Sequence, residues 1–276
     1  MANPKTNVKG QFFDIIKLMK NRAFPKTKKL IVSNWKMNPE SLKEAKKLFG
    51  AIKKKNFNTK KLISVICPPY LFESDLALNY SGGKFKFGFQ DIHFESDEKS
   101  TGEISTEMAK NSKVEYVILG HSERRENGET SEMVAEKIQK TIKAGLTPIV
   151  CVGEVERDEQ GSYLRFIERQ VFESVDGISK ANLSKIVFVY EPVWAIGKGK
   201  SSMSSHEIHQ MNIFIKKILV NLVGKNIAMN IPILYGGSVD ADNAKEIVEM
   251  GEVDGLLVGR SSLNPHVFGD ILNNLG

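Results

Sequence analysis

The stretch "IVFVYEPVWAIGKGKS", residues 186–201, joins the pattern of a buried strand to a loop that begins with a carboxylate. Residues 186–190 are apolar without alternation, which is typical of a strand buried on both faces. Pro192 then prevents the strand from continuing beyond Glu191. The tail "GKGKS" resembles the end of the phosphate-binding pattern G-x-x-x-x-G-K-[ST]. Trp194 occupies the position of its first glycine, so we exclude a Walker-type nucleotide site.

Seven further apolar runs of this kind recur along the chain, and helix-length stretches separate most of them. The stretch 41–55 repeats apolar residues at steps of three and four, as one face of an amphipathic helix does. Similar patterns occur at 131–145, which ends at a glycine suited to a helix C-terminus, and at 204–222, where Ser204 or Ser205 can cap the helix. The eight predicted strands are residues 30–33, 62–67, 85–89, 114–119, 147–152, 186–190, 231–235 and 255–258.

Eight buried strands that alternate with helices predict a single α/β domain over residues 29–276. Right-handed crossovers join such strands in parallel, and eight of them close into a (β/α)8 barrel of about 250 residues. No shift in composition and no long linker divides this part of the chain. An open doubly wound sheet is the alternative, but it more often has about five to seven strands. The strand number therefore favours the closed barrel.

Residues 1–28 are predicted to be a separate N-terminal extension. The apolar residues within 11–19 share one face of a helix, and Pro25 ends that pattern. The segment is rich in Lys rather than in Arg and Ser, and it contains Asp14, which argues against a transit peptide. We therefore expect an amphipathic helix or tail on the surface.

Bulk composition narrows the classes of function. The chain is 41% hydrophobic and 26% charged, which suits a folded domain, and no run of 18 apolar residues predicts a membrane span. The formal charge is +6, but the lysines are dispersed and not interleaved with aromatic residues. We expect a small anionic substrate rather than nucleic acid. Cys67 and Cys151 are the only cysteines, which indicates a reducing, cytoplasmic setting and gives no metal-binding spacing.

Polar residues and glycines follow most of the predicted strands, at the end where barrel enzymes have their active sites. Each has a simpler explanation when taken alone: Lys36 as a surface lysine, His121 as a structural histidine, Glu123 as half of an ion pair. Their joint placement indicates an active site instead. In strand order these residues are Asn34 and Lys36; Gln90 and Asp91; His121, Glu123 and Arg124; Cys151 and Glu154; Glu191; Gly236, Gly237 and Ser238; and Gly259 and Arg260.

Five segments in order resemble one known family closely. They are "NWKMN" (34–38), "GHSERR" (120–125), "YEPVWAIGKGK" (190–200), "YGGSV" (235–239) and "GLLVG" (255–259). These segments resemble the triosephosphate isomerase family over everything that follows the N-terminal extension. The resemblance implies a TIM barrel that interconverts dihydroxyacetone phosphate and D-glyceraldehyde 3-phosphate in glycolysis and gluconeogenesis. It implies no metal and no organic cofactor.

The resemblance also implies roles for the matched catalytic residues. Glu191 would be the base that moves a proton between adjacent carbons through an enediolate. His121 would be the electrophile, kept neutral by a helix N-terminus that we expect Ser122 to cap. Lys36 and Asn34 would bind the substrate and stabilise its developing negative charge. In addition, Trp35 would contribute to substrate binding, and Glu123 would hold Lys36 or a neighbour in place.

The phosphate group and the loop that covers it are also implied by the resemblance. The phosphate would bind backbone N–H groups of Gly197, Ser238, Gly259 and Arg260. A lid loop would close over the substrate and protect the enediolate. Its residues would be Pro192, Val193, Trp194, Ala195, Ile196, Gly197, Lys198, Gly199 and Lys200.

Three departures from the family pattern affect the phosphate site, the lid and the expected homodimer. Arg260 stands where the family most often has a second glycine, and Lys198 where it usually has threonine. The residues "EKS" at 98–100 replace a Gly-Ala-aromatic segment that in the family inserts into a partner subunit. The following residues do match the family, namely Thr101, Gly102 and Glu103. We therefore expect a homodimer with a weaker or altered interface.

Two alternatives to an active isomerase are considered. One is a related barrel enzyme that acts on another phosphosugar, and the other is a binding protein that retained the scaffold and uses residues 1–28 for docking. The segments around Lys36, His121 and Glu191 are intact, which argues against both.

Overall fold

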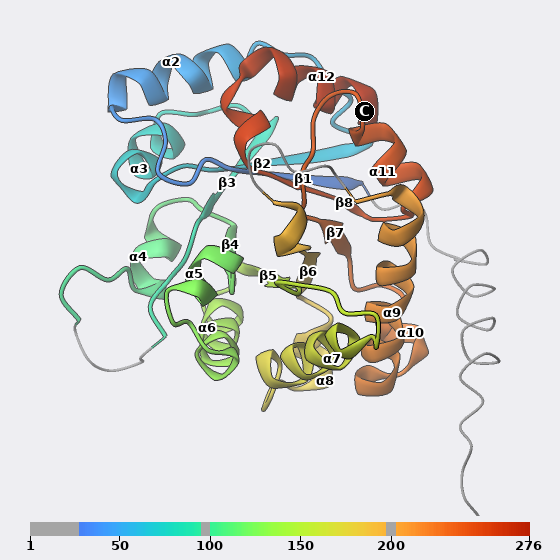
Figure 1. The fold of residues 1–276 in the computed structure, drawn as a ribbon. Coiled ribbons are helices and arrows are strands. Elements are labelled where there is room, and N and C mark those ends of the chain that lie inside the picture. The colour runs from blue at the N-terminus through green and yellow to red at the C-terminus, as the bar shows by residue number, and fades with distance from the viewer. Residues whose placement is uncertain (1–27, 95–99, 197–202) are drawn as a thin grey trace, which may run out of the picture.

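Eight parallel strands form a closed barrel, as the sequence predicted. The computed structural model describes residues 28–94, 100–196 and 203–276. Each strand pairs with the next along the chain, and the last returns to the first. In Figure 1 the helices surround the strands on the outside. The strands are β1 Lys29–Asn34, β2 Leu62–Cys67, β3 Phe85–Phe89, β4 Tyr116–Leu119, β5 Thr147–Val152, β6 Val187–Tyr190, β7 Ile233–Tyr235 and β8 Gly255–Val258.

Some strands begin later than the apolar runs indicated. The run 231–235 becomes a strand only at Ile233, because Pro232 has no backbone N–H to donate to a neighbouring strand. Val114 is buried, although β4 begins at Tyr116. Apolar character therefore predicted burial correctly but placed these strand boundaries too early.

The amphipathic stretches predicted at 41–55, 131–145 and 204–222 form α2, α6 and α9. Ser204 caps α9 in a capping box with Glu207, and Gly145 follows α6 with a φ of 80°. The α-helices are α2 Leu42–Ile52, α3 Tyr70–Leu78, α4 Thr106–Asn111, α5 Ser122–Glu126, α6 Ser131–Lys143, α7 Ser162–Ser174, α8 Lys180–Leu183, α9 Ser205–Val223, α10 Lys225–Ala228, α11 Ala244–Met250 and α12 Pro265–Leu275. Two short 3-10 helices are η1 Val193–Ala195 and η2 Arg260–Leu263.

The strands are apolar on both faces because two cores lie on either side of them. Val32, Val65 and Val189 belong to a core separate from the larger one that includes Ile31 and Ile66. Because successive strand residues point to opposite faces, neighbours such as Ile31 and Val32 enter different cores. This arrangement accounts for the lack of alternation in the sequence.

The barrel closes where β8 pairs with β1, with Leu30 opposite Gly255. A Cβ atom at Gly255 would lie 1.9 Å from the backbone oxygen of Leu30, so a side chain does not fit at this junction. Closure thus depends on a glycine at the first residue of the last strand.

Residues 1–27 lie outside the described part of the chain, so the helix predicted there and the separate extension remain predictions. Among the helices of the described residues, none has the length and apolar character needed to cross a membrane.

Candidate active site

A cavity of about 520 Å³ lies at the carboxyl ends of β1, β4, β6, β7 and β8. It brings together nine of the residues that the sequence analysis assigned to catalysis or substrate binding. Val193, Ile196 and Leu257 add apolar surface to its wall. The nine residues are Asn34, Trp35, Lys36, His121, Glu123, Glu191, Ser238, Gly259 and Arg260.

The loop after β1 holds Lys36 in an uncommon backbone conformation. Its φ is 54°, and its backbone N–H donates to Asn34 Oδ1 at 3.0 Å. Gln90 Nε2 donates to the Lys36 backbone oxygen at 2.9 Å, and Lys36 Nζ lies 2.6 Å from Glu123 Oε1. The ammonium group is therefore fixed at the cavity by residues from β1, β3 and α5. Trp35 also lines the cavity, but its side chain is completely buried in the core.

His121 caps the N-terminus of α5, a position that the sequence analysis assigned to Ser122. The imidazole Nδ1 accepts a hydrogen bond from the Glu123 backbone N–H at 3.2 Å. A ring nitrogen that accepts carries no proton, so a neutral His121 has its proton on Nε2. The cap was missed because histidine is not among the residues that usually cap helices. The cap orients Nε2 as a hydrogen-bond donor.

Glu191 follows β6 and is 2% exposed. Its Oε2 accepts from the Ser122 backbone N–H at 3.0 Å, and its Oε1 lies 3.2 Å from His121 Nε2. Among the described residues, Oε1 has no hydrogen-bond partner of good geometry. A Cβ atom at Gly236 would lie 2.9 Å from Glu191 Cγ, so the carboxylate is also packed closely against β7. One carboxylate oxygen is thus anchored by a backbone N–H, while the other is buried next to His121 Nε2.

Ser238, Gly259 and Arg260 bring the ends of β7 and β8 to the same cavity. A Cβ atom at Gly259 would lie 3.6 Å from Lys36 Cε, which shows how near the lysine stem passes. Ser261 Oγ donates to the Val239 backbone oxygen and ties the two loops together. This side of the cavity combines backbone groups with the positive charges of Lys36 and Arg260.

The remaining predicted residues lie elsewhere or outside the described part of the chain. Gly197, Lys198, Gly199 and Lys200 are among the residues not described, as are Glu98 and Lys99. Pro192 leads into η1, which includes Trp194 and Ala195. The predicted dimer loop does not line the cavity. Its Glu103 Oε2 lies 3.4 Å from His93 Nδ1, next to the exposed Thr101 and Gly102.

The cysteines and acidic residues offer no metal centre within the described ranges, where no group of three or more His, Cys, Asp or Glu side chains is arranged to hold an ion. Cys67 and Cys151 are both free and buried. Burial raises the pKa of both thiols, and the neighbouring Glu73 and Glu191 carboxylates add to the effect at Cys67 and Cys151 respectively. Neither thiol is therefore suited to act as a nucleophile.

Comparison with known proteins agrees with this geometry. A family model described as triosephosphate isomerase matches residues 29–275. A curated triosephosphate isomerase from Alkaliphilus oremlandii (strain OhILAs) is 41% identical over 248 residues, which cover 89% of this chain and 99% of the relative. These matches favour an isomerase over another phosphosugar enzyme or a non-catalytic binding protein. The chain therefore belongs to the triosephosphate isomerase family and is an enzyme that interconverts dihydroxyacetone phosphate and D-glyceraldehyde 3-phosphate, a step of glycolysis.

Proposed function

We propose that Glu191, His121 and Lys36 carry out the isomerisation by moving one proton between adjacent carbons of the triose phosphate. The observation that carries the proposal is that Glu191, His121 and Lys36 line one cavity, with Glu191 Oε1 3.2 Å from His121 Nε2. A base, a hydrogen-bond donor and a fixed positive charge are the three groups that an enediolate requires.

Glu191 accepts the proton from carbon. Its Oε1 has lone pairs free for the proton, whereas Oε2 is anchored by Ser122. The apolar side chains of Val193, Ile196 and Leu257 line the same cavity and limit the access of water to the reacting carbons. The carboxylate then returns the proton to the neighbouring carbon, while the proton of the substrate hydroxyl moves to the former carbonyl oxygen, and both transfers together complete the isomerisation.

His121 stabilises the substrate oxygen that becomes negative. A neutral imidazole with its proton on Nε2 donates a hydrogen bond to that oxygen, an arrangement described for this family. Lys36 adds a positive charge nearby, and Asn34 orients the Lys36 backbone. Glu123 keeps the Lys36 ammonium group at the cavity through the 2.6 Å ion pair.

The phosphate binds at the ends of β7 and β8, at backbone N–H groups of Ser238, Gly259 and Arg260, and we extend this site to Gly197 of the lid loop. Positive charge at Lys36 and Arg260 supports this placement for an anion. The reaction uses no metal and no organic cofactor in this scheme.

Replacement of Glu191 by aspartate tests the assignment of the base. The shorter side chain withdraws the carboxylate by about 1 Å, and a displacement of that size costs about 10²-fold in rate. A coupled assay with glyceraldehyde 3-phosphate measures kcat, and Glu126→Asp, an exposed glutamate at the same cavity, is the matched control. Unchanged turnover in Glu191→Asp would refute the assignment.

We further propose that the chain works as a homodimer through the loops that follow β1, β2 and β3. These loops lie side by side, because Gln90 contacts the backbone of Lys36 and Tyr70 donates to the Asp91 backbone oxygen. Met37, in the loop after β1, and Leu71, at the start of α3, are 92% and 86% exposed, which is unusual for large apolar side chains. Thr101, Gly102 and Glu103, in the loop after β3, would contribute to the same interface.

Light scattering across a dilution series tests the homodimer. We expect the mass of two chains at micromolar concentration, and a shift to one chain in Leu71→Asp. Phe166→Asp, which replaces an exposed apolar residue on α7, is the control that leaves the mass unchanged. A single-chain mass for the unmodified protein would contradict the proposal.

The same enzyme is proposed to act in the cytoplasm. The support is its glycolytic family together with two free, buried cysteines, since disulfides are rare in that compartment. Immunodetection after cell fractionation checks this placement, and recovery of the protein with secreted or membrane fractions would overturn it.

A further inference from the structure

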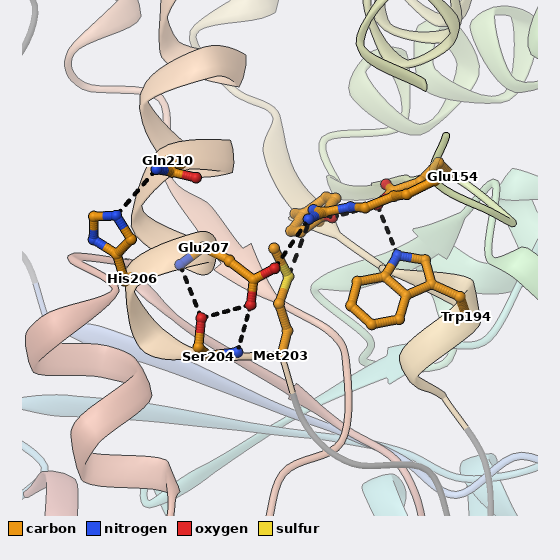
Figure 2. Close-up of polar contacts among 9 residues, drawn as sticks. Glu154, Trp194, Met203, Ser204, His206, Glu207 and Gln210 are labelled. Atoms are coloured by element: carbon orange, nitrogen blue, oxygen red, sulfur yellow. Dashed lines mark hydrogen bonds and ion pairs between the residues drawn. The ribbon is translucent and has the colours of Figure 1, made fainter. Parts of the chain in front are cut away.

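A second polar cluster lies around Glu154, which follows β5 by two residues (Figure 2). Glu154 is 1% exposed and does not line the substrate cavity. Its Oε1 accepts hydrogen bonds from Arg157 Nε at 2.8 Å, Tyr190 OH at 2.8 Å and Trp194 Nε1 at 2.9 Å. One oxygen of a buried carboxylate thus gathers three donors from separate segments.

Two of these donors bracket Glu191 in the sequence. Tyr190 comes directly before it, and Trp194 comes three residues after it. The Val193 backbone N–H also donates to the Glu154 backbone oxygen at 3.0 Å. The segment that presents the proposed base is therefore attached to Glu154 on both sides.

Arg157 connects this attachment to the start of α9. Its Nη2 donates to Tyr190 OH at 2.9 Å, and its guanidinium carbon lies 5.1 Å from the centre of the Trp194 ring. On the other side, Nη1 lies 3.4 Å from Glu207 Oε1, and Nη2 lies 3.8 Å from Met203 Sδ. The guanidinium group contacts a strand end, a 3-10 helix and a capped helix N-terminus together.

Arg157 balances the negative charge of the buried Glu154 carboxylate. Glu154 is buried, and in the part of the chain that the structure describes Arg157 is the cation that forms an ion pair with it. Tyr190 OH donates to Glu154 and accepts from Arg157, so loss of the arginine leaves a buried charge uncompensated and a hydroxyl acceptor unpaired. Both effects act directly on the residue before Glu191.

We infer that Arg157 is a positioning residue for the isomerisation, which sets the orientation of Glu191 through Tyr190 and Trp194 without touching the substrate. The inference rests on the proposed role of Glu191 as the base. A reacting carboxylate must be held within about 0.5 Å of its productive position by such supporting contacts. Lysine keeps the charge of arginine but lacks the planar fork that reaches Glu154 and Tyr190 at the same time.

The variants Arg157→Met and Arg157→Lys test the inference against a purely structural role. We expect Arg157→Met to lower kcat by about 10- to 100-fold, because misplacement by less than 1 Å is costly, and Arg157→Lys to lie between it and the unmodified enzyme. Inhibition by inorganic phosphate reports on the phosphate site, and its inhibition constant should change by less than about twofold. Arg169→Met, at an exposed ion pair on α7, is the control.

A double-mutant cycle with Glu191→Asp shows whether Arg157 acts through Glu191. In that background, where the carboxylate is already displaced, Arg157→Met should lower kcat much less than in the unmodified enzyme. Equal effects in both backgrounds, or a lower melting temperature with unchanged kcat, would overturn the inference. If Arg157→Met does not fold, Arg157→Lys enters the same cycle. Full activity of Glu191→Asp alone would instead refute the assignment of the base.

Discussion

Glu191 and Glu73 are both buried carboxylates, but their surroundings differ. Glu191 is 2% exposed, lines the substrate cavity and has one oxygen anchored by a backbone N–H. Glu73 lies in α3, is 0% exposed and does not line the substrate cavity. Burial raises its pKa to about 7, against the opposing effect of hydrogen bonds from Ser74 and Ser112. If a raised carboxyl pKa were the criterion, Glu73 would be the candidate base. The position in the cavity and the hydrogen-bond geometry identify Glu191 instead.

A third group of buried carboxylates, Asp91 and Glu129, lies outside the substrate cavity and is stabilised by ion pairs. Lys137, which is 1% exposed, contacts Asp91 Oδ1 at 2.7 Å and also pairs with Glu129. Arg124 Nη2 lies 2.8 Å from Asp91 Oδ2 and completes the network. Burial nevertheless raises the pKa of Asp91, and Lys137 opposes that rise. Cationic partners therefore balance the charges of these carboxylates, whereas Glu73 has hydrogen bonds from serines.

The largest expected effect is the loss of kcat in Glu191→Gln compared with Glu73→Gln. Replacement of Glu191 by glutamine removes the base, so we expect kcat to fall by about 10²- to 10⁴-fold, the range for a positioned acid–base group. Glu73→Gln removes an equally buried carboxylate and should change kcat by less than about twofold. Steady-state assays of both variants compare them directly. Equal losses in the two variants would mean that burial alone, not the cavity, identifies the important carboxylate.

Lys137→Met should destabilise the fold strongly, because it leaves the buried Glu129 without its ion-pair partner and the buried Asp91 with Arg124 alone. The loss of a single partner from a buried ion pair typically costs about 3–5 kcal/mol. Urea denaturation measures the free energy of unfolding, with Lys143→Met near the end of the same helix as the control. A change below 1 kcal/mol, roughly the size of a surface pair, would show that the network contributes little.

The pH dependence of stability should report on Glu73. Because its folded pKa of about 7 exceeds the ordinary value of 4.5, the folded state binds the proton more tightly. The contribution is complete below pH 4.5 and is lost as the pH rises through about 7, a total of about 3 kcal/mol. Denaturation at several pH values should show this decline, and Glu73→Gln should lack it. Identical pH profiles of the two proteins would contradict the assignment.

The smallest effect is expected at the exposed pair of Glu123 and Lys36, whose side chains are 54% and 30% exposed. Solvent screens such pairs, so Glu123→Gln should lower the free energy of unfolding by less than about 1 kcal/mol. Any loss of activity then comes from the position of the Lys36 ammonium group. A destabilisation comparable to that of Lys137→Met would mean that this exposed pair stabilises the fold as much as a buried ion pair does.

The sequence predicted the barrel and most of the cavity because both follow from local patterns. Apolar runs identified all eight strands, and the residues after them include Lys36, His121 and Glu191. The cap by His121 was not predicted, because histidine is not among the residues that usually cap helices. The roles of Gly197 to Lys200 and of Thr101 to Glu103 remain predictions.

Arg157 was missed for a different reason. Apart from Glu154, its partners come from β6, η1 and the start of α9, so no spacing in the sequence relates them. Glu73 was missed likewise, because one glutamate between two predicted strands gives no sign that it faces the interior. Long-range contacts of single side chains therefore required the structure, whereas repeated local patterns did not.

The pairing of β8 with β1 has a consequence for synthesis of the chain. The edge of β1 stays without its second neighbour until β8 has left the ribosome, since Leu30 pairs with Gly255 near the end of the sequence. An exposed edge strand can pair with other chains. A nascent or truncated chain that lacks β8 therefore has an open sheet, and its yield in cells should depend on chaperones more than that of the complete barrel.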